Sequence, residues 1–151
     1  VLTAVITRHV SAEEQYLYPT VRAVLPEGER IAADETAAGR RLLGTLRRLD
    51  AARSAGGEAY RRLVAALRAQ LERHTDEATE RVLPRLREVC SDADLVRLGN
   101  RILVAEEAAP TRPHPGAPDR PPWNKLVGPA LGVADKLRDA LTRRVTYPAD
   151  L

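Results

Sequence analysis

The chain has few of the residues that form covalent or aromatic sites, and it has no long apolar run. None of its 151 residues is methionine, and aromatic residues make up only 3% of the chain. No stretch of about 18 consecutive apolar residues occurs, so we expect no membrane-spanning helix and no membrane partner. No signal peptide is visible. Because the chain begins at Val1 and lacks methionine, we interpret it as a fragment or a processed chain.

Cysteine is almost absent too. Cys90 is the single cysteine, so it has no intrachain disulfide partner, and it lacks the paired spacing of a zinc site. This usage favours a reducing, cytoplasmic location. We interpret Cys90 as a small buried apolar residue near a helix end.

The chain also lacks the features of a nucleic-acid-binding protein. Its net charge is only +3, and the positive excess comes from the tail after residue 108. A basic stripe with interleaved aromatic side chains would be expected of a nucleic-acid-binding chain. We therefore expect no nucleic-acid partner.

What the chain does have is apolar residues at helical spacing over its first 108 residues. The spacing predicts a helix that opens the chain and is kinked at Pro19, followed by helices over about 30–53, 60–89 and 92–107. The stretch "SDAD" at 91–94 has the pattern of a helix N-cap. Helices joined by short turns indicate an all-α, antiparallel four-helix bundle over residues 1–108.

Three further regions follow the bundle. Residues 109–123 are proline-rich and predict an extended linker or strap. Residues 124–144 have the pattern of an amphipathic helix, which we expect to be broken near Gly128–Pro129 and to pack on the bundle. Residues 145–151 form a tail. His114, in the strap, is interpreted as a solvated or capping side chain.

Two similar segments contain two of the three histidines. In "RHVSAEEQYLYPTVR" and "RHTDEATERVLPRLR", His9 and His74 each precede a proline by ten residues. Both histidines lie on the apolar face of a helix, and Glu13 follows His9 by one turn on that face. Such a pair has two readings: ligands of a metal ion in the bundle core, or a hydrogen-bonded histidine and glutamate. In the second segment Ala78 occupies the position that corresponds to Glu13, with Glu77 beside it as a substitute.

These two segments and the tail "APTRPHPGAPDRPPWNKLVGPALGVADKLRDAL" resemble the hemerythrin-like, or HHE cation-binding, family, in particular its actinobacterial members. The resemblance implies a four-helix bundle with a non-haem di-iron centre that binds dioxygen or that stores or senses iron. His9 and Glu13 match the HxxxE motif of the family's second helix, and His74 matches a histidine of its fourth.

The sequence departs from the family pattern at several positions. Ala78 replaces a glutamate, the family's third-helix histidines fall near Asp34 and Gly39, and its first helix has no counterpart. We therefore expect an incomplete bundle, with the C-terminal helix as the candidate to cover its open side. The ligand set is reduced to His9, Glu13, His74 and Glu77, which suits one iron ion, or manganese or zinc.

The alternative is a metal-free helical interaction domain that receives a partner or a second copy of the chain as a homodimer. Asp34 and Glu35 are candidates for an additional donor to the metal site, and Tyr16 and Tyr18 are candidates for a hydrogen bond to a ligand. We expect no enzyme activity, because neither a nucleophile elbow nor a phosphate-binding glycine loop occurs.

Overall fold

The computed structural model describes residues 1–54, 56–114, 123–142 and 144–147. All regular elements among these residues are helical, which confirms the predicted all-α fold. The order is α1 (Leu2–Ala12), η1 (Glu13–Leu17), α2 (Tyr18–Val24), α3 (Gly28–Ala52), α4 (Gly57–Asp76), η2 (Glu77–Val82), α5 (Leu83–Val89), α6 (Asp92–Ala108) and α7 (Trp123–Leu141), where η marks a π-helical turn.

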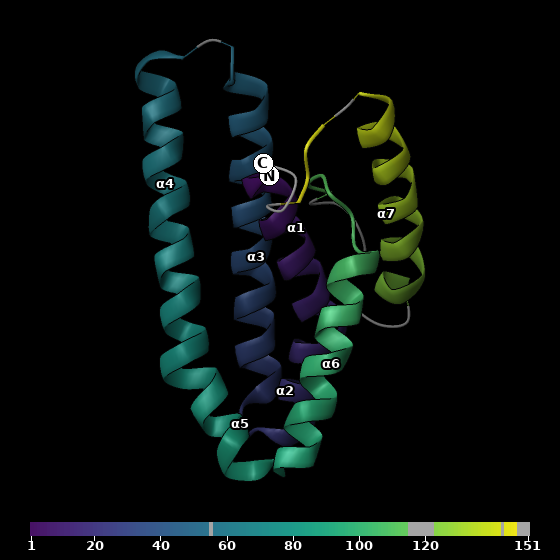
Figure 1. The fold of residues 1–151 in the computed structure, drawn as a ribbon. Helices are drawn as coiled ribbons and strands as arrows, with labels where there is room; N and C mark the ends of the chain where they lie inside the picture. The colour runs from purple at the N-terminus through teal and green to yellow at the C-terminus, as the bar shows by residue number, and fades with distance from the viewer. Residues whose placement is uncertain (55, 115–122, 143, 148–151) are drawn as a thin grey trace.

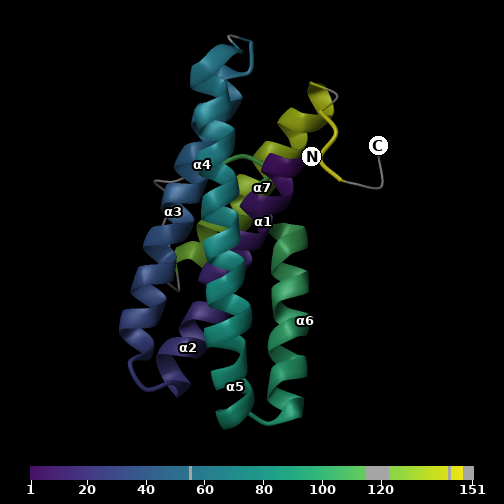
Figure 2. The same cartoon turned by 90° about the vertical axis from the view of Figure 1, so that its left-hand side faces the viewer.

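These elements form four long helical segments that run alternately up and down, and a fifth that lies outside them (Figure 1). The segment α1–η1–α2 packs on α3 and on α6, and α3 packs on α4. At the lower end of Figure 1, α5 contacts both α2 and α6. The fourth wall, against α1, is therefore α6, and the expectation that the C-terminal helix covers an open side was wrong. Instead α7 packs on the outside, against α6 and η1. Figure 2 shows α6 beside α1 in the second view.

Two apolar clusters hold the bundle together. The upper cluster joins α1, α3 and α4 through Ile6, Val10, Leu42, Leu43, Leu46 and Leu67. The lower cluster joins η1, α2, α3, η2 and α5 through Leu17, Tyr18, Val21, Leu25, Ile31, Ala32, Val82 and Leu86. Each fully buried leucine contributes about 1.5–3 kcal/mol. Along the first segment, Glu13 lies between Val10 of the upper cluster and Leu17 of the lower one, so a carboxylate interrupts the apolar core.

The two prolines of the similar segments follow π-helical turns. Pro19 is in the first turn of α2, directly after η1, and Pro84 is in the first turn of α5, directly after η2. Proline has no N–H to donate, and its ring clashes with the carbonyl four residues earlier. A wider π-helical turn before the proline relieves that clash without ending the helix. The sequence predicted a kink at Pro19 and a helix that continues past Pro84, but neither π-helical turn.

The ends of the helices are set by local chemistry. Ser91 caps α6, because its Oγ accepts a hydrogen bond from the Asp94 N–H at 3.2 Å, as the "SDAD" pattern predicted. At the start of α3, a Cβ on Gly28 would lie 2.1 Å from the Val21 carbonyl oxygen, so glycine permits the close approach of α2 and α3.

The predicted break in the C-terminal helix was wrong, because α7 continues through Pro129. Glycines on both sides of this proline bring α7 close to the bundle. A Cβ on Gly128 would lie 3.2 Å from Gln15 Nε2, and one on Gly132 would lie 2.2 Å from the Ala108 carbonyl oxygen.

Part of the proline-rich segment is fastened to α7. The Asp135 carboxylate accepts hydrogen bonds from the N–H groups of Thr111 and Arg112, at 3.1 and 2.9 Å. Asp139 binds the Thr111 hydroxyl and the Arg112 guanidinium. The predicted strap thus lies against α7 as far as His114, and its residues 115–122 are outside the described part of the chain, as are residues 148–151 of the predicted tail.

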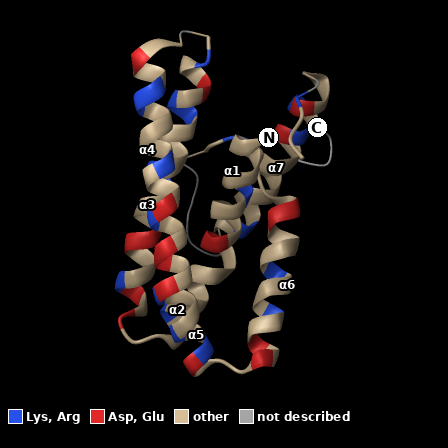
Figure 3. Cartoon of the chain, turned by 60° about the vertical axis from the view of Figure 1, so that its left-hand side comes forward, with Lys and Arg blue, Asp and Glu red and all other residues tan. Residues whose placement is uncertain are grey.

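The surface of the bundle carries charges of both signs. Acidic and basic residues are interleaved along α3 and α4 (Figure 3), and several form ion pairs one turn apart, such as Arg68 with Glu72. No described helix combines the length and apolarity that crossing a membrane requires.

Candidate metal centre

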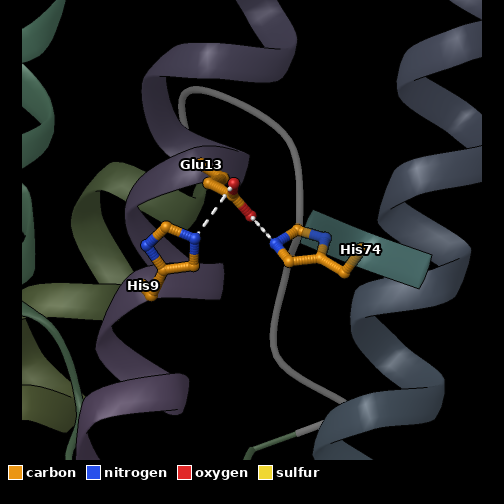
Figure 4. Close-up of side chains that lie close together, drawn as sticks. All are labelled: His9, Glu13 and His74. Atoms are coloured by element: carbon orange, nitrogen blue, oxygen red, sulfur yellow. Dashed lines mark ion pairs between the residues drawn. The ribbon is translucent and has the colours of Figure 1, made fainter. Parts of the chain in front are cut away.

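His9, Glu13 and His74 come together and form what we call the histidine–glutamate cluster (Figure 4). Glu13 and His74 are shielded, but the His9 side chain is 47% exposed, so it lies at the edge of the bundle and not on a buried face as the sequence predicted. His9 comes from α1 and Glu13 from the first residue of η1, while His74 comes from the last turn of α4. One donor atom from each residue lies within 4.8 Å of the other two. The sequence predicted all three as ligands, and the fold brings them together.

Both imidazoles point the same nitrogen at the carboxylate. Nε2 of His9 lies 3.2 Å from Oε1 of Glu13, and Nε2 of His74 lies 3.3 Å from Oε2. The ring centroids are 5.6 Å apart and the rings are nearly perpendicular. The three side chains therefore converge on one small region.

The outer nitrogen of each imidazole faces a second carboxylate. Nδ1 of His9 lies 3.1 Å from Oε1 of Glu106 on α6, and Nδ1 of His74 lies 3.5 Å from Oε2 of Glu35 on α3. A carboxylate on the far nitrogen fixes the orientation of a metal-binding histidine and makes it more basic. In addition, the Tyr18 hydroxyl donates a hydrogen bond to Oε2 of Glu13 at 3.0 Å.

The electrostatics of the cluster follow from these contacts. Burial by itself raises the pKa of the Glu13 carboxyl, but the contacts of His74 and His9 outweigh burial and hold that pKa at about 2. The close contact with Glu13, reinforced by Glu35, raises the pKa of His74 to about 10. The contact with Glu13 also raises the pKa of His9. Burial raises the pKa of the Tyr18 phenol, which keeps it a donor.

The cluster fits a divalent metal ion by its donor types and by one orphaned atom. Nε2 of His74 is buried and makes no well-aligned hydrogen bond, although it contacts Glu13. A buried polar atom without a good partner is costly unless another group occupies that direction. Two imidazole nitrogens and a carboxylate oxygen are donors that suit Fe(II), Mn(II) and Zn(II).

Glu77, the fourth predicted ligand, lies apart from the cluster. Its carboxylate pairs with Arg81 at 2.9 Å on the same segment. It lines a cavity of about 220 Å³ between α3 and α4, where Asp34 and Gly39 also lie. Asp34 faces Arg30 at 3.4 Å. Asp34 and Gly39, the positions at which the family resemblance implied further histidine ligands, thus line this cavity.

The remaining predicted side chains have other surroundings. His114 contacts Asp135 of α7 at 3.0 Å, so it belongs to the strap. Cys90 is a half-buried free thiol at the C-terminal end of α5. Tyr16 is covered by Lys125 of α7, whose Nζ lies 4.4 Å from the ring centroid.

Sequence reasoning missed Glu106. No spacing rule links residues that are 97 positions apart. One feature of the sequence could have indicated this contact. Glu106 and Glu107 lie in the last turn of the helix predicted over 92–107, which was expected to run antiparallel to the helix that contains His9.

Comparison with known proteins agrees with this geometry. The family model of the hemerythrin HHE cation-binding domain matches residues 2–86, more than half of the chain. An uncharacterised hemerythrin-like protein of Schizosaccharomyces pombe is 24% identical over 138 residues, which cover 91% of this chain and 68% of that protein. No solved structure matches the chain. The helical bundle and the match over its first three long segments show that the chain belongs to the hemerythrin HHE cation-binding family.

Proposed function

We propose that the histidine–glutamate cluster binds one divalent metal ion, with iron as the first candidate and manganese or zinc as alternatives. The observation that carries the proposal is the convergence of both Nε2 atoms on the two oxygens of Glu13, at 3.2 and 3.3 Å. His9, Glu13 and His74 would hold the ion, and Glu106 and Glu35 would orient the two imidazoles.

The proposed role is binding, sensing or storage of iron or dioxygen, rather than catalysis. Bound iron would supply redox chemistry and affinity for small ligands such as dioxygen. Within the cluster, each of the two ring nitrogens of an imidazole faces a different carboxylate. Glu13 contacts both histidines and Tyr18. No group of the cluster remains as an unengaged base for a substrate. The single Cys90 favours a cytoplasmic location for this role.

A single ion is proposed because, among the described residues, His9, Glu13 and His74 are the group of three whose donor atoms lie within 4.8 Å of one another. On the other side of His74, Glu35 faces Nδ1, and the cavity between α3 and α4 is lined by Asp34 and Glu77 together with Ala38 and Gly39. Asp34 pairs with Arg30. Glu77 is held by Arg81. Ala78 offers no donor, so the described residues supply one set of three ligands.

Metal titration of chelator-treated protein tests this proposal. We expect Mn²⁺, which is stable in air, to bind at one ion per chain in calorimetry. His74→Ala and His9→Ala should each weaken binding at least tenfold, whereas His114→Ala, which removes the histidine paired with Asp135, should not. Equal affinity in all four proteins, or no binding to the parent chain, would contradict the proposal.

A metal-free interaction domain is the second candidate, because the cluster has partners of its own. Each of the four ring nitrogens of His9 and His74 lies within 3.5 Å of a carboxylate oxygen. Such a network can be structural. If it is, adding metal to the chelator-treated chain should leave the midpoint of thermal unfolding unchanged. A chain that binds metal would instead be stabilised by mass action, so its midpoint would rise.

A further inference from the structure

A second feature of the fold is an apolar groove between the α4–η2–α5 segment and α6. Its volume is about 320 Å³, within the range of pockets that bind small molecules. The wall is mainly leucine and isoleucine, and the lining residues that matter here are Ala78, Leu83, Leu86, Arg87, Leu98 and Gly99. His9 and Glu13 also line it, so the groove reaches the histidine–glutamate cluster.

The groove has two ends of different character. Arg87 of α5 and Leu95 of α6 both lie near the turn that joins these helices at the bottom of Figure 1. Along α6, the lining runs from Leu95 to Ile102, about 10 Å at the rise of an α-helix. Glu106, which contacts His9, follows one turn later. The groove therefore runs from Arg87 at one end to the cluster at the other.

Glycine at position 99 keeps this groove wide. No atom of the described chain lies within 4 Å of where a Cβ on Gly99 would be, and the residue does not adopt a left-handed backbone. Glycine inside a helix costs about 1 kcal/mol relative to alanine. Neither crowding nor backbone conformation requires glycine here, and its effect is to leave the wall of the groove open beside Leu98.

Arg87 provides a charge for a ligand to meet. Its guanidinium makes no ion pair with any described carboxylate, in contrast to Arg81 six residues earlier, which pairs with Glu77. At the opposite end, the Glu13 carboxylate already contacts His9 and His74. Arg87 is the charged lining residue that lacks a described carboxylate partner, so a carboxylate ligand would place its head group at the Arg87 end.

We propose that this groove binds a medium-chain aliphatic carboxylate. The carboxylate pairs with the Arg87 guanidinium, and the hydrocarbon chain lies along Leu83 and Leu98 toward Ala78. Burial of the chain against these residues supplies affinity, and the Arg87 cation at the mouth selects the head group. The inference does not require a metal ion, because none of these contacts involves the Nε2 atoms of the cluster.

Calorimetric titration of chelator-treated protein with sodium octanoate tests the proposal. We expect one octanoate per chain. Arg87→Gln should weaken binding at least tenfold, and Gly99→Leu, which fills the groove, should abolish it. Two matched controls should bind like the parent chain: Arg85→Gln, whose side chain faces the Pro26 carbonyl, and Gly44→Leu, another helical glycine with open space around it. Octylammonium should bind at least tenfold more weakly than octanoate.

Several results would overturn the groove assignment. These are an absence of saturable octanoate binding, parental affinity in both Arg87→Gln and Gly99→Leu, or equal affinity for octylammonium. Sedimentation of the same samples tests another occupant, a second copy of the chain. If the parent chain forms a dimer that Gly99→Leu disrupts, and if it binds no octanoate, the groove is an interface between two copies. His74→Ala separates the two proposals, because it should remove metal binding and leave octanoate affinity unchanged.

Discussion

Nε2 of His74 lies 3.3 Å from Oε2 of Glu13, and this contact joins α4 to the first long segment of the bundle. Both side chains are shielded, with 12% and 4% of their surfaces exposed. A charged contact in such surroundings stabilises the fold only while both partners are present, because either one alone would be a buried uncompensated group. The same contact is the centre of the proposed metal site.

The first prediction is a coupling between these two residues in the metal-free chain. His74→Ala should lower the free energy of unfolding by about 3 kcal/mol, because it leaves the buried Glu13 carboxylate with fewer partners. In the double variant with Glu13→Gln, the loss should be smaller than the sum of the two single losses. Urea unfolding of chelator-treated proteins measures this cycle.

The exposed pair Arg68–Glu72 on the same helix is the control for that cycle. Its removal should change stability by less than about 0.5 kcal/mol, since solvent screens it. Strict additivity at His74 and Glu13 would show that their contact carries no stability.

A second prediction concerns the hydroxyl of Tyr18. Tyr18→Phe keeps the ring, which packs in the lower apolar cluster, and removes the hydrogen bond to Glu13. We expect a loss of about 1–3 kcal/mol in unfolding free energy, because a buried hydrogen bond to a charged group is lost. Metal affinity should fall as well. An unchanged midpoint in thermal and urea unfolding would mean that the hydroxyl does not support Glu13.

The third prediction addresses the two outer carboxylates. Glu35→Gln and Glu106→Gln remove the charge that faces Nδ1 of each histidine, so each should lower metal affinity about 10- to 100-fold. Mn²⁺ titration measures the change. Glu72→Gln, an exposed glutamate paired with Arg68, is the control and should leave affinity unaltered. If all three variants bind alike, the outer carboxylates do not orient the imidazoles.

A fourth prediction concerns the strap. Asp135→Asn replaces the carboxylate oxygen that accepts from the amides of Thr111 and Arg112 and contacts His114. These two amides should exchange hydrogen at least tenfold faster, because a charged acceptor is replaced by a weaker neutral one. Exchange in α5, which packs against α2 and α6 at the other end of the bundle, should stay constant. Protection of both amides at the parental level would show that Asp135 does not hold the strap.

Part of the candidate site was readable from the sequence. The four-residue spacing of His9 and Glu13 places both on one helical face, and the repeated proline offset drew attention to His74. Antiparallel packing then brings His74 to the carboxylate. Glu77 was chosen because it adjoins Ala78, but local pairing with Arg81 holds its carboxylate elsewhere.

Other features depend on tertiary contacts that a local pattern does not contain. Glu106 reaches His9 only because α6 packs against α1. Pro129 predicted a break, yet α7 remains continuous where Gly128 and Gly132 let it approach the bundle closely. A kink was expected at Pro19 and none at Pro84, whereas a π-helical turn precedes both prolines.

The central claim is that His9, Glu13 and His74 hold one ion. X-ray absorption spectroscopy of the chain loaded anaerobically with one equivalent of Fe(II) tests it most directly. The account predicts scattering from two imidazole rings around each iron, none from a second iron, and loss of one imidazole in His9→Asn. An iron neighbour, or a spectrum without imidazole scattering, would contradict it.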